Sequence, residues 1–167
     1  KYDDESDGAP IWISPVSSYA TPMAEAFRNA YDLCNDWINY ENHVDCHPPI
    51  IINISDGQPT DGGRDFTKLK TIVNQIKSLK TNYGNTYVFN VHISSLLHDK
   101  VLFPNSIESI ESTYAKLLFN LSSKLNSKML DIGVSRGYNI DSNSRGFIFN
   151  GNSSDLINFL NIGSSPS

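Results

Sequence analysis

The residues most suited to chemistry follow an isoleucine-rich stretch. Residues 50–54 contain four isoleucines and lead directly into Ser55, Asp56 and Gly57, with Thr60 and Asp61 shortly after. The β-branched run predicts a strand buried on both faces, and the residues after it predict a turn. A carboxylate at the carboxyl end of a buried parallel strand lies at the rim where open α/β sheets bind ligands. Asp56 is therefore the first candidate. Spacing alone favours a simpler role, in which Asp56 and Asp61 shape a turn or cap the next helix.

A second candidate is Thr21, which precedes Pro22 at a predicted helix start. Thr predicts the N-cap and Pro the first helical position. Apolar residues at three-to-four spacing then predict an amphipathic helix to about Asn42; they are Met23, Ala26, Phe27, Ala30, Cys34, Trp37 and Ile38.

His43, Asp45 and His47 come next. Two histidines four apart bind zinc when they lie on a helix, but Pro48 and Pro49 predict a turn here. We therefore do not predict a metal site in this loop.

Helices and strands alternate along the rest of the chain. The pattern predicts helices from Arg64 to the turn at Asn82 to Asn85, from Ile110 to about Asn126, over residues 127–138 and from Ser154 to Leu160, and strands over residues 86–93 and 145–150. Such alternation predicts an α/β fold with a Rossmann-like open, mainly parallel sheet and helices on both faces. Only three strong strands are predicted, with a doubtful edge strand between Pro10 and Val16. So thin a sheet suggests that strands are missing.

Composition limits the function classes. The net charge of −5 argues against broad binding to nucleic acid or to an anionic membrane. Two cysteines, Cys34 and Cys46, are too few for a disulfide framework and lack metal-ligand spacing, and Cys34 is predicted to be a buried thiol. No apolar run approaches membrane-spanning length, and no signal-peptide pattern is present. The sequence starts at Lys1 without a methionine, so we expect a piece of a longer protein.

Thr21 before Pro22 and Asp56 before Gly57 together resemble two motifs of the von Willebrand factor A (VWA) domain. In that family a metal-ion-dependent adhesion site uses three loops: Asp-x-Ser-x-Ser on the first strand, a Thr before a helix, and an Asp after a buried strand. Thr21 matches the second loop and Asp56 the third. Further stretches resemble the bacterial intracellular branch linked to tellurium resistance and stress signalling, which implies a cytoplasmic location; they are residues 49–62, 89–95, 145–150 and 156–163.

The first motif does not occur in the sequence. The nearest stretch, Asp4 to Gly8, has glycine in place of the last serine, and no buried strand precedes it. The resemblance therefore implies that residues 1–167 are one partial VWA-like domain, its C-terminal portion, with the N-terminal strands missing from this chain.

The resemblance implies a site for Mg²⁺, or for Mn²⁺ or Ca²⁺, because a hydroxyl, a carboxylate and waters are hard oxygen ligands. Thr21 and Asp56 would be the metal ligands. Ser55, Thr60 and Asp61 would lie at the rim or support the ligands. We expect the oxygens of Thr21 and Asp56 to converge, and metal binding by this chain alone to be weak or absent because two ligands replace too little of the ion's hydration shell.

We expect a metal-dependent protein–protein interaction module, not an enzyme, that recognises an Asp or Glu of a partner protein in a bacterial signalling, stress or phage-defence assembly. The alternative is a metal-dependent hydrolase or phosphoryl-transfer domain that uses Asp56 and Asp61. The missing strand, on the same or a separate chain, would lie beside the strand ending at Asp56. We therefore expect an unpaired edge along residues 50–54, exposed apolar faces on the helices after Thr21 and after Gly63, and aggregation of the isolated chain.

Overall fold

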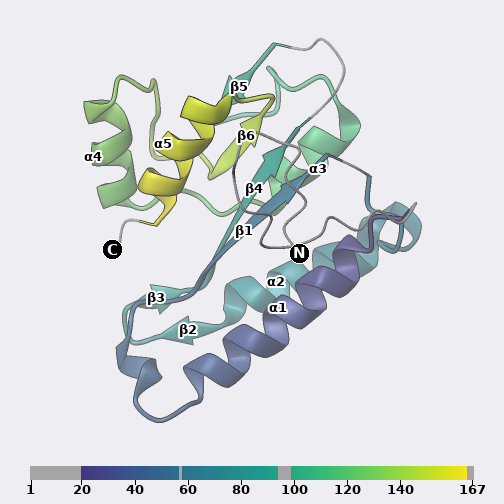
Figure 1. The fold of residues 1–167 in the computed structure, drawn as a ribbon, viewed down its shortest axis with the longest axis vertical. Helices are drawn as coiled ribbons and strands as arrows, with labels where there is room; N and C mark the ends of the chain where they lie inside the picture. Colours follow the sequence, from purple (N-terminus) through teal and green to yellow (C-terminus); the bar gives the residue numbers. More distant parts are fainter. Residues whose placement is uncertain (1–19, 57, 94–98, 165–167) are drawn as a thin grey trace, which may run out of the picture.

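The computed structural model describes residues 20–56, 58–93 and 99–164, which form an α/β fold with five α-helices. Helices and strands alternate along the chain as predicted (Figure 1). In chain order they are α1 (Met23–Ile38), η1 (His43–Asp45), β1 (Ile50–Ser55), η2 (Arg64–Phe66), α2 (Thr67–Ser78), β2 (Lys80–Thr81), β3 (Gly84–Asn85), β4 (Tyr87–His92), β5 (Val101–Leu102), α3 (Thr113–Leu121), α4 (Ser127–Ser135), β6 (Phe147–Phe149) and α5 (Ser153–Gly163).

The main sheet has four strands in the order β1-β4-β6-β5. Strands β1, β4 and β6 are parallel, and β5 is antiparallel to β6, so the sheet is mixed but mostly parallel. The register pairs Ile50 with Tyr87 and Ser55 with His92, which aligns the carboxyl ends of β1 and β4. The mainly parallel sheet is thus confirmed. Strand β5 lies where the sequence predicts a loop, because two residues carry no readable alternation.

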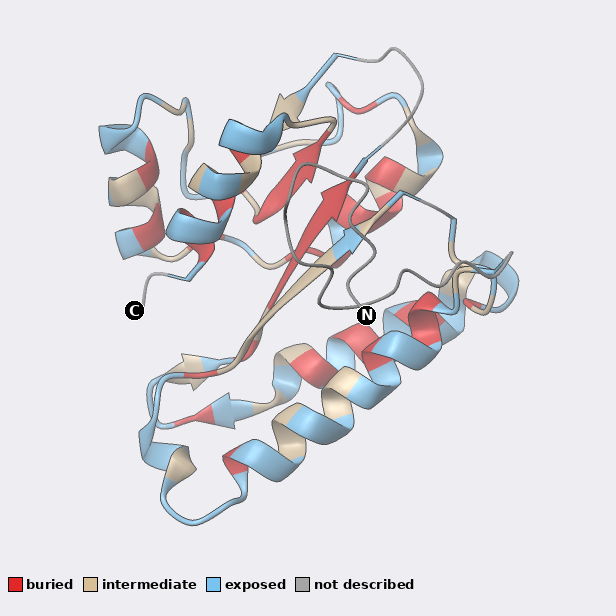
Figure 2. Cartoon of the chain, in the orientation of Figure 1, coloured by how far each residue is buried: buried red, intermediate tan, exposed pale blue. Residues whose placement is uncertain are grey.

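Helices cover both faces of this sheet, as predicted. On β4, Val88 faces one core and Phe89 and Val91 face the other, as successive strand residues do. The first core packs α1, α2 and α3 against the sheet, and the second packs α4 and α5 (Figures 1 and 2). The buried side chains concentrate on β4 and β6 at the centre (Figure 2).

Strand β1 is less buried than its sequence predicts. Ile50, Ile51 and Ile52 are half-buried, and Ile54 is 49% exposed. The prediction of burial on both faces was wrong because β1 lies at the edge of the sheet: within the described residues it pairs with β4 alone.

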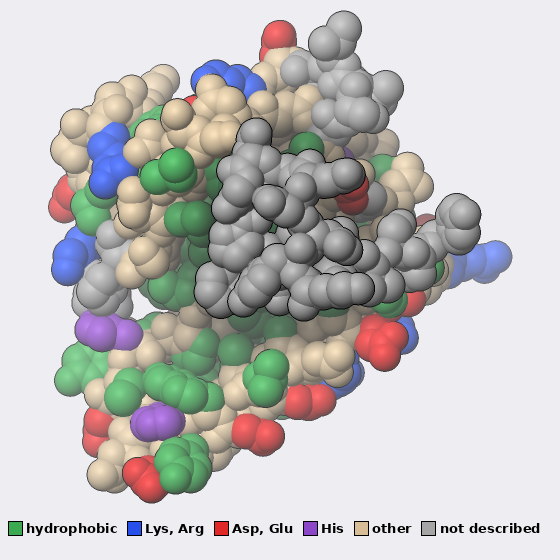
Figure 3. All heavy atoms as spheres, in the orientation of Figure 1, with side chains coloured by type: hydrophobic (Ala, Val, Ile, Leu, Met, Phe, Trp, Pro, Cys, Tyr) green, Lys and Arg blue, Asp and Glu red, His purple; other side chains and the backbone are tan. Residues whose placement is uncertain are grey.

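The two helices beside this edge differ. The apolar face of α2 is buried at Leu69, Ile72, Val73 and Ile76, so the expectation that it is exposed was wrong. Helix α1 does expose apolar side chains: Leu33 is 72% exposed, and a cavity of ≈ 370 Å³ lies between Leu33, Cys34, Trp37 and Pro49. Cys34 is half-buried in this wall and not fully buried. Figure 3 shows hydrophobic side chains gathered over this part of the molecule.

Helices α3 and α5 begin at capping residues that directly precede them in the sequence. Helix α3 starts late, after Ser112, whose hydroxyl accepts a hydrogen bond from the Ala115 N–H, and it ends where Ser122 turns extended. The third predicted helix, 110–126, was therefore too long. Helix α5 begins with a capping box between Asn152 and Asp155, close to its predicted start.

No helix within the described residues is long and apolar enough to cross a membrane. The predicted strand near Pro10–Val16, the acidic stretch Asp4–Gly8 and the serines Ser94 and Ser95 lie outside the described residues.

Candidate functional site

Two hydrogen bonds join the Thr21 loop to the loop after β1. The Thr21 N–H donates to Thr60 Oγ1 at 3.0 Å, and the Thr60 N–H donates to the Thr21 carbonyl at 2.9 Å. The Thr60 hydroxyl and backbone thus both engage Thr21. The two stretches that carry the candidate residues are held side by side at the carboxyl end of β1.

The carboxylate of Asp61 caps the start of α1. Its Oδ1 accepts a hydrogen bond from the Ala24 N–H and its Oδ2 one from the Glu25 N–H, both at 2.8 Å. These N–H groups belong to the first turn, where a helix has no partners of its own and attracts negative charge. Thr21 was predicted to be the N-cap. The structure instead places Pro22 there, with no cap bond from its own side chain, and Asp61 supplies the bonds from 37 and 36 residues away.

The electrostatics of Asp61 agree with this role. Partial desolvation raises the pKa of Asp61, but the N–H groups of Ala24 and Glu25 and the charge of Lys68 outweigh it and hold the pKa below its usual value. Asp61 therefore stays ionised in mild acid and keeps both oxygens on the helix. Asp61 does cap a helix, but it caps α1 and not the helix that follows it.

Asp56 lies at the end of β1, is exposed and makes no hydrogen bond within the described part of the chain. The negative charge of Asp56 acts on His92 at the end of β4, where it raises the pKa of the imidazole against the larger, lowering effect of burial. The register places Ser55 opposite His92, so Asp56 and His92 share one rim of the sheet.

His92 is 7% exposed, and its ring stacks on Phe149 with centroids 5.5 Å apart. Its Nδ1 lies 3.2 Å from the Ser55 carbonyl. Because a carbonyl only accepts, Nδ1 carries the proton and Nε2 keeps its lone pair. Burial lowers the pKa of His92, and the Ser55 carbonyl and Asp56 only partly offset this, so the imidazole is neutral at pH 7.

The predicted residues thus form two groups on one rim. Two hydrogen bonds join Thr21 to Thr60, a contact that we call the clamp, and Asp61 caps the helix that begins just after Thr21. Asp56 lies with His92, and Ser55 is half-buried at the end of β1. No hydrogen bond links Thr21 to Asp56 in the described residues, and convergence of their oxygens stays a prediction.

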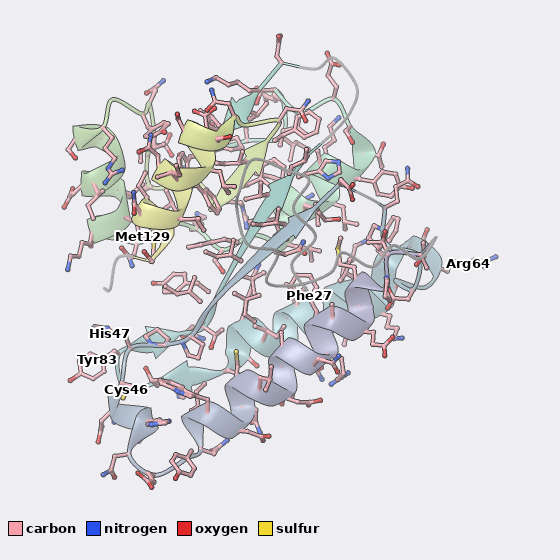
Figure 4. All side chains as sticks on the ribbon, viewed as in Figure 1. Phe27, Cys46, His47, Arg64, Tyr83 and Met129 are labelled. Carbon is pink, nitrogen blue, oxygen red and sulfur yellow. The ribbon has the colours of Figure 1, made fainter. Side chains whose placement is uncertain are left out.

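The His43–His47 loop is arranged differently from a metal site. The His43 ring stacks on Trp37 and its Nδ1 contacts the Trp37 carbonyl at 2.9 Å, whereas the His47 ring packs against Tyr83. Asp45 accepts a hydrogen bond from Asn82. Figure 4 shows Cys46, His47 and Tyr83 together at one end of the molecule, with Arg64 at the far end of α2. Within the described residues, His43, Asp45 and His47 thus each contact a different partner.

Across the described residues, no three His, Cys, Asp or Glu side chains gather as a metal-binding group. For a hard cation at the rim, the fitting donors are the Asp56 carboxylate and the Thr21 hydroxyl. Asp61 does not fit, because both its oxygens are bonded to α1. That Thr21 and Asp56 hold a metal, and that two ligands bind it weakly or not at all, stay predictions.

The position of His92 beside Asp56 was not predicted from the sequence. It could have been predicted from the strand order, because the ends of two neighbouring parallel strands meet at one edge of the sheet. Asn150 also lies at this edge, with a positive φ of 52°, and its N–H donates to the His92 carbonyl.

Comparison with known proteins gives no match: no family model fits the chain, and no curated protein or solved structure is significantly similar to it.

Proposed function

We propose that this chain is part of a metal-dependent protein–protein interaction module that recognises a carboxylate of a partner protein, in a bacterial signalling, stress or defence assembly in the cytoplasm. The observation that supports it best is the clamp between Thr21 and Thr60. It joins the Thr21 loop to the loop that follows Asp56, and these resemble two of the three loops of a VWA adhesion site.

The residue chemistry supports a hard cation. Asp56 is exposed, without a hydrogen bond in the described part of the chain, and follows β1 directly. The Thr21 hydroxyl accepts no cap bond in the described residues, unlike the threonine of an ordinary N-cap, because Pro22 takes that position and Asp61 accepts the bonds. A bound Mg²⁺, Mn²⁺ or Ca²⁺ would supply an open coordination position for an Asp or Glu of the partner. Asp56 and Thr21 would hold it, with Ser55 and Thr60 orienting the loop.

Within the described residues, β1 pairs with β4 alone, and this supports the second part of the proposal, that a further strand carrying Asp-x-Ser-x-Ser pairs along residues 50–54. Exposed backbone groups along an edge strand readily accept another strand. The half-buried isoleucines of β1 and the exposed Leu33 of α1 would gain burial from it. This strand would come from another segment or another chain and would complete the ligand set.

The alternative enzyme, a hydrolase or phosphoryl-transfer domain using Asp56 and Asp61, has less support. Asp61 would have to leave two hydrogen bonds at the start of α1 to act on a substrate. No observation in the described residues favours this alternative over the binding module.

Paramagnetic line broadening by Mn²⁺, followed by NMR in the full-length protein, tests the proposal. We expect the amide signals of Thr21 and Asp56 to broaden first, and Asp56→Ala to remove this effect. Asp131→Ala, which removes the same charge from an exposed position on α4, is the matched control. Broadening centred elsewhere, or unchanged by Asp56→Ala, would refute the metal site.

A further inference from the structure

A second pocket lies at the opposite end of the sheet from Asp56. It has a volume of ≈ 410 Å³ and opens where β4 begins, between the last turn of α2 and the end of α3. Its lining includes three cationic and three hydroxyl side chains: Lys77, Lys124, Arg145, Thr86, Ser122 and Ser123. Such a cluster is unexpected in a chain of net charge −5.

None of these cations has a carboxylate partner within the described residues. Arg145 donates to the Ser122 carbonyl at 2.6 Å and lies 5.2 Å above the Phe119 ring. Lys124 Nζ donates to Asn143 Oδ1 at 2.8 Å. The acid that Lys124 affects is Asp141, which is exposed and already hydrogen-bonded by Asn105. Within the described residues, no carboxylate therefore forms an ion pair with these three cations, and Asp141 acts on Lys124 only through its charge.

The pKa of Lys77 reflects this unpaired positive charge. Burial and the positive charge of Arg145 lower the pKa of Lys77 to about 8. A half-buried ammonium beside a guanidinium is unfavourable unless an anion joins them. An anion in the pocket would favour the charged form of Lys77 and raise its pKa.

Two of the three hydroxyl groups, those of Thr86 and Ser123, also lack an acceptor in the described residues, whereas the Ser122 hydroxyl donates to the Leu118 carbonyl at 2.8 Å. The Thr86 side chain is 2% exposed, and its hydroxyl has no hydrogen-bond partner in the described part of the chain. Ser123 Oγ accepts from the Val88 N–H, which leaves its own proton to donate. Together with the ammonium and guanidinium protons, the lining offers an excess of donors. Its complement is a ligand with several acceptor oxygens and negative charge.

We propose that this pocket binds a phosphate group, either inorganic phosphate or the phosphoryl end of a small phosphate monoester. A tetrahedral dianion accepts several hydrogen bonds at once and pairs with both lysine and arginine. Lys77 and Arg145 would hold the charge, and Lys124 would close the outer side. This site is independent of the proposed metal rim, because it lies at the amino ends of the strands.

Thermal unfolding at constant ionic strength, in a buffer free of phosphate, tests the proposal. At ten times the dissociation constant, inorganic phosphate should raise the Tm by about 4 °C. Lys77→Met should weaken binding about tenfold. Lys128→Met, which removes the same charge from an exposed position on α4, should leave the response unchanged.

A second measurement separates the sources of the ligand. Amide chemical shifts of Thr86 and Arg145 are followed by NMR during titration with inorganic phosphate and, separately, with glycerol 3-phosphate. Equal affinities would identify the free anion as the ligand, and tighter binding of glycerol 3-phosphate would identify a monoester. No shift at these residues with either probe, or equal loss of binding in both lysine variants, would overturn the proposal.

Discussion

Thr21 and Thr60 hold each other through two hydrogen bonds, although 39 residues separate them in the chain. The hydroxyl of Thr60 accepts one bond and its own N–H donates the other. This reciprocal contact fixes where α1 begins relative to the loop that leaves β1. The position of both candidate metal ligands depends on it.

Loss of the Thr60 hydroxyl should loosen this contact. We expect Thr60→Ala to lower the free energy of unfolding by about 1 kcal/mol, because the Thr21 N–H loses its acceptor. Thr60→Ser keeps the oxygen and should cost much less. Urea unfolding followed by circular dichroism measures both, and equal stability of the two variants would contradict the role of the hydroxyl.

The helix cap predicts a larger effect at Asp61. Asp61→Ala removes two charge-assisted bonds from the start of α1, and we expect a loss of about 2 kcal/mol in the free energy of unfolding. Asp56→Ala, which breaks no hydrogen bond in the described residues, should change stability by less than about 0.5 kcal/mol.

The same carboxylate predicts an acid limb of stability. The pKa of Asp61 is lower in the folded state than in the unfolded chain, so its contribution is fully present above about pH 4 and is lost as the pH falls through the folded-state pKa. Asp61→Asn should flatten this part of the pH profile in urea unfolding. A profile that keeps its full slope in the variant would show that other carboxyl groups produce it.

Lys77 predicts a pH dependence of the same sign in alkali. The pKa of Lys77 falls from 10.5 to about 8 on folding, so between these values the unfolded state binds more protons and stability rises with pH. Lys77→Met should remove that rise and should stabilise the protein at pH 7 in phosphate-free buffer. Subtracting the two pH profiles isolates Lys77 from the cysteines and tyrosines that also titrate there.

The cysteines should differ in reactivity. Cys46 is exposed, whereas burial raises the pKa of the Cys34 thiol and lowers its thiolate fraction. A thiol reagent such as Ellman's should therefore show one fast and one slow phase at pH 8. Cys46→Ser should abolish the fast phase, and loss of the slow phase instead would contradict the assignment.

Periodic patterns in the sequence were sufficient to predict β4, α2 and the parallel sheet. The apolar repeat of α2 is buried as its spacing indicates, because this helix packs against the sheet along its length. The burial of β1 could not be predicted in this way. A run of isoleucines looks the same at the centre and at the edge of a sheet, and only strand order distinguishes them.

The candidate site was predictable as a set of residues but not as a set of contacts. The sequence placed Thr21 at a helix start and Asp61 after a strand, yet the bond from Asp61 to α1 joins residues with no local relation. The pocket around Lys77 was not predicted for the same reason. Its cations are far apart in sequence: Lys77 lies on α2, Lys124 follows α3, and Arg145 precedes β6. Each looks like an ordinary surface charge in sequence.

The pairing of β1 with β4 also determines the order in which this protein can fold. The paired residues are 37 positions apart, and α2 together with the small β2–β3 sheet lies entirely within the intervening loop. Closing such a loop costs conformational entropy, and pairing between strands so far apart in sequence forms slowly. If α2 forms first, fewer residues of the loop between β1 and β4 remain unfolded when the strands pair. Substitutions that weaken α2 should therefore slow refolding more than they speed unfolding. Because the crossover is long, β1 should remain unpaired for longer during folding before it pairs with β4.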